Sequence, residues 1–372
     1  MLEMERANPE LADIESIFIS IQTATKTISD LVRKASLTGI TGLVETASGE
    51  SSINVQGEEQ KKLDVITNDV LKNALKWNGK LGTLASEEED APVMLDNLGN
   101  KVYSGDLFVE EGRYVAVFDP LDGSSNVDAN IPVGTIFGIF ENNDECLLDD
   151  DDLFSENVDP EALQRKCVQR TLQPGKNLIA AGYVLYSAAT TLVFTIGNGV
   201  QGYTLDENIG EFVLTHPNIK IPPRGKIYSM NESNRHDWDQ PLKDYINDIQ
   251  QGLGGTKTKY TSRYVGSMVA DVHRTLLYGG IFGYPADKKN PDGKLRLLYE
   301  AAPMAFLMEQ AGGYALTGKN RIMDIPPKTV HQRVPCILGS RLDVAELRRY
   351  YEASDNPDLI ERCNARLNSA DN

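Results

Sequence analysis

Residues 114–124 read Tyr114-Val115-Ala116-Val117-Phe118-Asp119-Pro120-Leu121-Asp122-Gly123-Ser124. The first five residues form an apolar run that is typical of a buried β-strand, and Asp119 follows directly. Pro120 restricts its own φ and lacks an N–H, which helps to turn the Leu121 carbonyl toward a cation. Gly123 lets the backbone approach a ligand, and Ser124 offers a hydroxyl and an N–H. A strand, an acidic turn and small residues opening a helix predict a site that holds cations and a phosphate together.

Other acidic residues support this interpretation. Glu87 and Glu88 follow a predicted strand, and Glu300 lies in an otherwise apolar helix. A carboxylate among apolar neighbours is costly unless it is paired or bound to a metal. Phosphate monoesters hydrolyse very slowly in water, and Mg²⁺ held by carboxylates can neutralise the phosphoryl charge. The alternative is an ordinary turn, because Asp, Pro and Gly all favour turns.

The flanking patterns predict a layered α/β fold. Apolar residues at helical spacing indicate a helix over residues 14–32, and another is expected from Asp64 to Trp77. Strands are predicted at 133–140 and across 178–205, where Asn198-Gly199 is a hairpin turn signal. Beyond them, strands alternate with helices near 240–250, 266–278 and 297–311, the last closed by Gly312-Gly313.

The length of 372 residues favours two lobes, because a single core rarely grows beyond about 300 residues. Prolines and a glycine over 217–225 mark the boundary, so we expect an N-terminal lobe at 1–215 and a C-terminal lobe at 216–372. The acidic stretch 142–174 holds few apolar residues and is interpreted as a mobile surface insertion of the first lobe. The predicted fold is a two-lobed layered α/β sandwich with mixed sheets.

Charge and composition exclude several classes of partner. A net charge of −17 argues against a sequence-independent grip on nucleic acid or anionic lipid. No apolar run approaches the ~20 residues that cross a bilayer, and the N-terminus has neither a signal-peptide core nor the composition of a transit peptide. Four cysteines are too few for a secreted disulfide scaffold. The four scattered histidines are interpreted as surface or hydrogen-bonded residues rather than metal ligands.

Five segments together resemble fructose-1,6-bisphosphatases, and the resemblance runs from about residue 14 to the C-terminal helix. The Asp119–Ser124 motif alone marks only the wider superfamily of Li⁺-sensitive sugar phosphatases. The matching segments are Lys61-Lys62-Leu63-Asp64-Val65, Ser86-Glu87-Glu88, Asp119-Pro120-Leu121-Asp122-Gly123-Ser124-Ser125-Asn126, Arg263-Tyr264-Val265-Gly266-Ser267-Met268-Val269-Ala270-Asp271 and Gly293-Lys294-Leu295-Arg296-Leu297-Leu298-Tyr299-Glu300. The resemblance implies hydrolysis of the 1-phosphate of fructose 1,6-bisphosphate to fructose 6-phosphate and phosphate, with Mg²⁺ as the cofactor and Mn²⁺ as an alternative ion.

The resemblance also assigns the catalytic machinery residue by residue. The implied metal ligands are Glu87, Glu88, Asp119, Asp122, Glu300 and the carbonyl of Leu121. Asp64 and Glu88 would polarise the attacking water, with an acid from the preceding loop. That acid falls on Glu58, a longer side chain than the Asp that the family has at this position.

The substrate contacts follow in the same way. Gly123 and Ser124 would bind the 1-phosphate through backbone N–H groups, and Lys294 and Met268 would border the furanose ring. The 6-phosphate would meet Asn231, Tyr264 and Tyr284, with Arg263 arriving from a neighbouring subunit of a homotetramer. Arg and Tyr donors suit phosphate oxygens. Without the resemblance, core packing explains the two tyrosines equally well.

Cys146 and Cys167 flank the acidic insertion. From composition alone, two free thiols are the simpler interpretation. The resemblance instead implies the chloroplast form of the enzyme, in which a disulfide between these cysteines is reduced by thioredoxin and switches on the enzyme of the Calvin cycle. It places the protein in the chloroplast stroma, with the transit peptide absent from this chain; the alternative is a cytoplasmic enzyme of gluconeogenesis.

Two other functions are alternatives to this one. Sedoheptulose-1,7-bisphosphatase shares the metal chemistry but fits a longer sugar, and the sequence blocks favour the fructose enzyme. A catalytically silent cation-binding protein would have lost the acids that activate water, yet Asp64 and Glu88 are both present.

Overall fold

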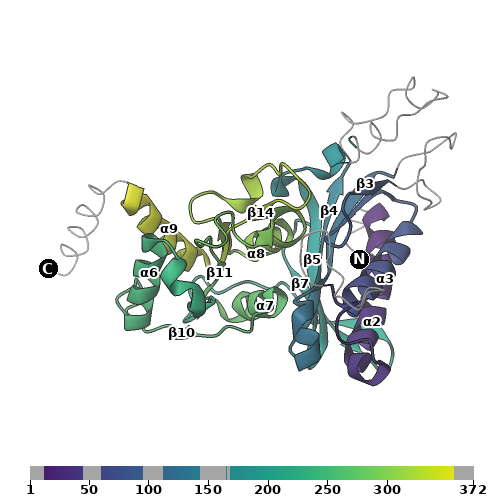
Figure 1. Cartoon of the computed structure of the whole chain (residues 1–372), viewed down its shortest axis with the longest axis horizontal. Coiled ribbons are helices and arrows are strands. Elements are labelled where there is room, and N and C mark those ends of the chain that lie inside the picture. Colours follow the sequence, from purple (N-terminus) through teal and green to yellow (C-terminus); the bar gives the residue numbers. More distant parts are fainter. Residues whose placement is uncertain (1–11, 45–59, 95–111, 143–164, 166–167, 356–372) are drawn as a thin grey trace.

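The computed structural model describes residues 12–44, 60–94, 112–142, 165 and 168–355 (Figure 1). Its elements form layers: an N-terminal pair of helices, a large sheet, a second pair of helices and a smaller sheet with its own helices. The prediction of a layered α/β fold with mixed sheets is therefore confirmed. The division at residue 216 stays a prediction, since one apolar core joins strands before this point to helices after it.

The larger sheet has eight strands in the order β2-β1-β3-β4-β5-β6-β7-β8. β1 and β3 are parallel, and every other neighbouring pair is antiparallel. Its strands are β1 (Leu81–Ser86), β2 (Val93–Met94), β3 (Tyr114–Asp122), β4 (Val133–Glu141), β5 (Leu178–Tyr186), β6 (Thr190–Thr195), β7 (Gln201–Asp206) and β8 (Glu211–His216). The centre of this sheet is buried on both faces, which is why its strands read as continuous apolar runs.

Two layers of helices cover the two faces of this sheet (Figure 1). The helices α2 (Ala12–Thr38) and α3 (Lys62–Lys76) lie on one face, and α7 (Met268–Tyr278) and α8 (Ala302–Gln310) lie on the other. Successive residues of β3 alternate between these layers: Val115 and Val117 join the α7–α8 core, whereas Ala116 and Phe118 join the α2–α3 core. The position of a residue along β3 therefore determines which helix layer its side chain faces, and this also applies to the acidic residues at the end of the strand.

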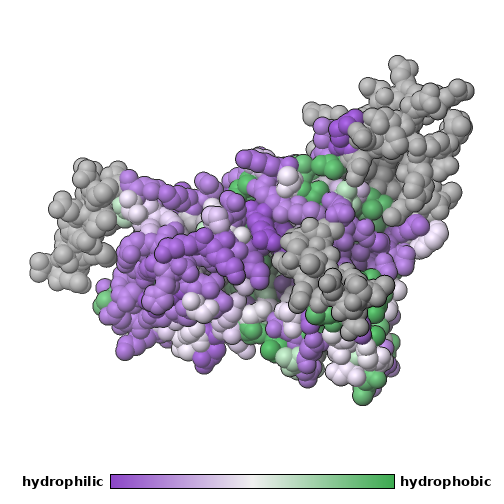
Figure 2. All heavy atoms as spheres, in the orientation of Figure 1, coloured by the Kyte–Doolittle hydropathy of each residue, from purple (hydrophilic) through white to green (hydrophobic). Residues whose placement is uncertain are grey.

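The smaller sheet has five strands in the order β10-β9-β11-β15-β13. These are β9 (Ile227–Ser229), β10 (Thr261–Ser262), β11 (Ile281–Tyr284), β13 (Tyr314–Leu316) and β15 (Cys336–Gly339). The helices α6 (Gln240–Gln251) and α9 (Arg341–Asp355) pack on it and on one another. In Figure 2 the surface of this half is mostly hydrophilic, whereas apolar atoms gather near α2.

A short ladder connects the last segments of the fold. It joins β12 (Leu295–Arg296) to β14 (Arg333–Val334) in antiparallel register. β12 leads into a π-helical segment, Leu297–Ala301, which α8 continues. Short segments of 3₁₀ helix occur at Ser124–Ala129, Gly175–Asn177, Glu232–Asp237 and Ile322–Asp324.

Local predictions agree with these elements, with two differences. The predicted helices are confirmed at Ala12–Thr38, Lys62–Lys76, Gln240–Gln251 and Met268–Tyr278. The strand predicted at 114–118 is β3, which continues through the acidic turn to Asp122. The helix predicted at 297–311 begins as a π-helix rather than an α-helix. The predicted insertion at 142–174 lies mostly outside the described residues. Among the helices that the structure describes, none combines the length and apolar composition of a membrane span.

Candidate active site

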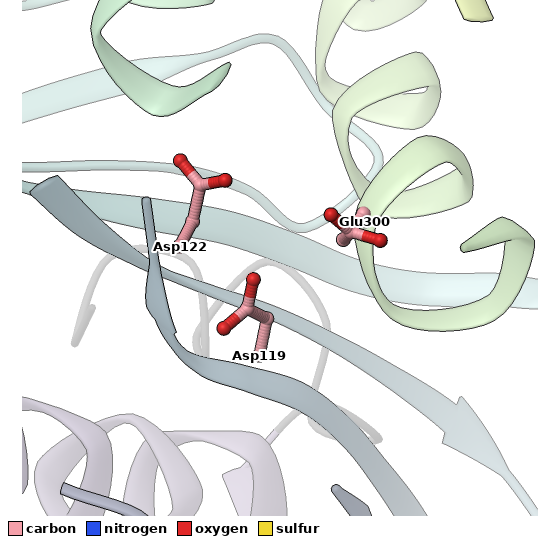
Figure 3. A group of neighbouring side chains, drawn as sticks. All are labelled: Asp119, Asp122 and Glu300. Atoms are coloured by element: carbon pink, nitrogen blue, oxygen red, sulfur yellow. The ribbon is translucent and has the colours of Figure 1, made fainter. Parts of the chain in front are cut away.

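Three buried carboxylates meet between the large sheet and the start of the π-helix (Figure 3). One carboxylate oxygen from each of Asp119, Asp122 and Glu300 lies within 4.8 Å of the other two. Figure 3 shows the side chains of β3 and of the helix directed toward one space. The two parts of the predicted metal site, which are far apart in the sequence, therefore come together.

A bulge in β3 places both aspartates on one face of the sheet. Asp119 is opposite Ile136 and Asp122 is opposite Gly134, so Pro120 and Leu121 together face only one residue of β4. Without the extra residue, side chains three positions apart would point to opposite faces. Leu121 instead joins the α2–α3 core and leaves Asp122 beside Asp119.

The backbone of the bulge is held by side chains. The N–H of Leu121 donates to Asp119 Oδ1 at 2.9 Å, and the hydroxyl of Thr135 donates to the carbonyl of Pro120 at 2.8 Å. Gly123 then adopts φ +74°, a conformation that side chains disfavour. A Cβ at this position would stand 3.0 Å from Ser267 Oγ, so the turn needs glycine for both reasons.

Glu300 is positioned by the π-helical segment. Pro303 follows three residues later, and because it lacks an N–H it cannot donate to the carbonyl of Tyr299. This missing bond favours the wider turn at Leu297–Ala301, a kind of irregularity that is frequent at functional sites. The sequence pattern could not reveal it, because apolar periodicity hardly distinguishes a single π-turn from an α-helix.

The cluster concentrates negative charge in a buried space. Burial raises the pKa of Asp119 well above its usual range, and the charges of Glu87, Asp122 and Glu300 raise it further. Burial also raises the pKa of Asp122 to about 6, although the N–H of Val269 and the hydroxyl of Ser267 oppose this change. The N–H of Val269, in the first turn of α7, donates to Asp122 Oδ2 at 2.9 Å. Such a site favours either protons or a cation.

Arg296 is a residue of the site that the sequence analysis did not single out. Its guanidinium lies 3.0 Å from Glu87 Oε1 and 3.9 Å from Glu300 Oε2, and its N–H donates to Glu300 Oε2 at 2.5 Å. Its side chain is only 5% exposed. A signal did exist, because an arginine four positions before a buried glutamate on an apolar segment suggests a paired charge.

A cavity of about 450 Å³ opens on the carboxylates. Twelve predicted site residues line it: Asp64, Glu87, Glu88, Asp119, Leu121, Asp122, Gly123, Ser124, Met268, Tyr284, Lys294 and Glu300. The lining also includes Leu43, Lys61, Ser125, Gly266, Leu295 and Arg296, to which the sequence analysis assigned no role. Most of the predicted set thus faces one space.

The two acids predicted to activate water are held by hydrogen bonds. Asp64, in the first turn of α3, accepts from the N–H of Lys61 at 2.8 Å. The amide of Gln60 donates to Glu88 Oε2 at 2.7 Å. Both acids line the cavity, on the side of the N-terminal helices.

Three predicted substrate residues do not line the cavity. The hydroxyl of Tyr264 donates to that of Tyr284 at 3.2 Å, so it lies directly behind a lining residue. Asn231 caps the turn at 232–237 by accepting from the N–H of Ser233, and Arg263 is exposed. Glu58, Cys146 and Cys167 lie outside the described residues.

Comparisons with known proteins agree along most of the chain. Two family models match, "Fructose-1-6-bisphosphatase, N-terminal domain" at residues 1–217 and "Fructose-1-6-bisphosphatase, C-terminal domain" at residues 221–352. Fructose-1,6-bisphosphatase 1, chloroplastic, from Arabidopsis thaliana is 48% identical over 94% of this chain and 79% of its own length. The cytosolic fructose-1,6-bisphosphatase of Oryza coarctata is 46% identical over 95% and 92%. The crystal structure of the holo form of Leishmania major fructose-1,6-bisphosphatase has a TM-score of 0.81 at 39% identity, and covers 94% of this chain and 97% of that one.

Proposed function

Because the chain belongs to the fructose-1,6-bisphosphatase family, we propose that it removes the 1-phosphate of fructose 1,6-bisphosphate with Mg²⁺ held by its buried carboxylates. The products are fructose 6-phosphate and phosphate. The observation that carries the proposal is the convergence of Asp119, Asp122 and Glu300 within 4.8 Å, on a cavity lined by two further acids predicted as metal ligands.

The residues present fit a hard divalent cation. Carboxylate and carbonyl oxygens suit Mg²⁺ and Mn²⁺, whereas the described part of the site offers no thiolate or imidazole ligand. Burial, and after it the charges of neighbouring acids, raises the pKa values of Asp119 and Asp122, and a bound cation would favour their ionised forms again. Glu87, Glu88, Asp119, Asp122, Glu300 and the carbonyl of Leu121 would hold the ions. Bound there, Mg²⁺ supplies positive charge that neutralises the phosphoryl oxygens.

The other residues of the cavity orient the water and the substrate. Asp64 and Glu88 polarise the attacking water, and the hydrogen bonds from Lys61 and Gln60 hold their carboxylates in place. Glu58 is proposed as a third acid. The backbone N–H groups of Gly123 and Ser124 bind the 1-phosphate.

The sugar and the second phosphate lie toward the C-terminal half. Lys294 lies 5.7 Å from the ring centre of Tyr284 and, with Met268, borders the furanose ring. The hydroxyls of Tyr264 and Tyr284, which lie 3.2 Å apart, hold the 6-phosphate together with Asn231. The exposed Arg263 completes the phosphate site of a neighbouring subunit.

We propose a homotetramer, in keeping with that role for Arg263. The strand β8 is an edge strand on which Val213 and Leu214 are 44% and 49% exposed. An edge with exposed apolar residues favours association. Leu214→Glu is expected to lower the molar mass measured by sedimentation, whereas an unchanged mass would exclude this edge from the interface.

Thiol control is proposed for the segment that follows β4. The side-chain amide of Gln173 donates to the carbonyl of Glu141 at 2.9 Å, which attaches the end of the insertion to this strand, and β4 pairs with the Asp119 strand. A disulfide between Cys146 and Cys167 would strain this attachment, and thioredoxin would release it in the chloroplast stroma. If Cys146→Ser activity still rose with added dithiol, this disulfide would be excluded.

One assay tests the main proposal. We expect phosphate release from fructose 1,6-bisphosphate that requires Mg²⁺ and falls by a factor of at least about 10² in Asp122→Asn. Sedoheptulose 1,7-bisphosphate serves as the competing substrate. Faster turnover of the longer sugar would reassign the substrate, and equal rates with and without chelator would overturn the role of the metal.

A further inference from the structure

His331 bridges two acidic segments of the site without lining the cavity itself. Its Nδ1 lies 2.8 Å from the hydroxyl of Tyr299, and its Nε2 lies 3.0 Å from the carbonyl oxygen of Glu89. Tyr299 precedes Glu300 in the π-helical segment, and Glu89 follows Glu87 and Glu88. One imidazole thus connects the two stretches of chain that bring carboxylates to the site from its two sides.

The direction of both hydrogen bonds is set by chemistry. A carbonyl oxygen can only accept, so Nε2 carries the proton that is donated to Glu89. Burial lowers the pKa of His331, which leaves the ring neutral at about pH 7. Nδ1 of the neutral ring must then accept, so the Tyr299 hydroxyl is the donor. Both nitrogens are used, in one defined tautomer.

The backbone around His331 is anchored to one of the two segments. The N–H of Leu297 donates to the carbonyl of Gln332 at 2.7 Å, and Arg296 pairs with Arg333 in the β12–β14 ladder. The turn that carries His331 therefore moves with the start of the π-helix. Its imidazole reaches from there to the acidic turn, which other bonds attach to the large sheet and to α3.

We propose that His331 is a positioning residue that holds the Glu87–Glu88 turn and the Glu300 segment at the separation needed for their carboxylates to bind the same ions. The inference rests on the metal site of the proposed function. Only an imidazole offers a donor and an acceptor on opposite sides of a rigid ring at this position. Asn can replace Nδ1 and Gln can replace Nε2, but neither replaces both.

The test compares His331→Asn, His331→Gln and His331→Phe with wild type. Mn²⁺ binding is measured by calorimetry without substrate, and the Mg²⁺ concentration for half-maximal activity is measured separately. We expect each polar variant to weaken Mn²⁺ binding by about fivefold, from one lost hydrogen bond, and His331→Phe by about tenfold or more. His216→Gln, an exposed histidine on β8, is the matched control and should bind as wild type does.

The unfolding midpoint, measured without metal, shows whether a variant binds Mn²⁺ more weakly because His331 positions the ligands or only because the protein is less stable. Weaker Mn²⁺ binding by folded Asn and Gln variants, with KM for the sugar nearly unchanged, supports the proposal. Unchanged Mn²⁺ affinity in both, even with a lower unfolding midpoint, would overturn it. Wild-type protein that binds no Mn²⁺ would overturn the proposed metal site as well, so the two failures are distinguishable.

Discussion

The substitution Asp122→Asn separates two effects of the carboxylate cluster. One is the loss of folding stability that its buried charge causes, and the other is its role in metal-dependent activity. Asp122 is buried beside Asp119 and Glu300, and its Oδ2 accepts from the N–H of Val269 at 2.9 Å. An asparagine keeps an acceptor for this N–H and removes one negative charge. We therefore expect the variant to be more stable than wild type in the absence of metal, although it has lost most of its Mg²⁺-dependent activity.

The expected gain in unfolding free energy follows from the raised pKa of Asp122. Burial raises the pKa of Asp122 from 3.8 to about 6, which corresponds to about 3 kcal/mol at about 1.4 kcal/mol for each pH unit. Between these two pH values the folded state binds more protons than the unfolded state. The free energy of unfolding therefore falls as pH rises through this range, and the penalty is complete above the folded pKa. Asparagine does not ionise, so the variant does not carry this penalty.

Urea unfolding with a chelator measures this difference. At about pH 7.5 we expect the unfolding free energy of Asp122→Asn to exceed that of wild type by about 3 kcal/mol. Near pH 5 we expect about half of that difference, because Asp122 in the folded wild type is then largely protonated. Saturating Mg²⁺ should reduce or reverse this difference in stability, because it stabilises the wild type, which binds it. A ligand stabilises the state that binds it by ~2.7 kcal/mol at about 100 times its Kd.

The control is Asp30→Asn on the exposed face of α2, where Asp30 pairs with Lys34. This surface change should alter the unfolding free energy by less than about 0.5 kcal/mol. If Asp122→Asn were less stable than wild type in chelator at about pH 7.5, or if its gain did not shrink on acidification, the proposed electrostatic cost of the cluster would be refuted.

Three further substitutions test single features of the site. Arg296→Met removes the buried guanidinium that pairs with Glu87, so the unfolding free energy of the metal-free protein in urea should fall by about 3 kcal/mol. An unchanged midpoint would contradict the importance of this pair. Gly123→Ala forces a side chain into φ +74° next to Ser267 and should cost about 1 kcal/mol, with a larger loss in kcat/KM for the bisphosphate, whereas wild-type kinetics would show that the turn tolerates a Cβ. Asp64→Asn should lower kcat by about 10²–10⁴ while the unfolding midpoint stays near wild type, and full activity would remove Asp64 from proton transfer.

Local sequence patterns accounted for most of the secondary structure. The spacing of apolar residues located α2, α3 and β3. A helix buried on one face has apolar residues at helical spacing, and a strand buried on both faces is a continuous apolar run. The acidic turn after β3 was recognisable from residue chemistry, and Glu300 from its apolar neighbours. These features depend on residues close together in the sequence.

Long-range arrangement was decided only by the folded chain. The bulge that turns Asp122 to the side of Asp119 depends on pairing with β4, and the link from His331 to Glu89 joins residues 242 positions apart. The contact of Arg296 with Glu87 likewise depends on packing, because these residues are far apart in the sequence. The sequence by itself therefore determined which groups could bind cations and phosphate, because that is a property of each side chain. Tertiary structure decided which of them share one buried space, because distance and desolvation exist only after packing.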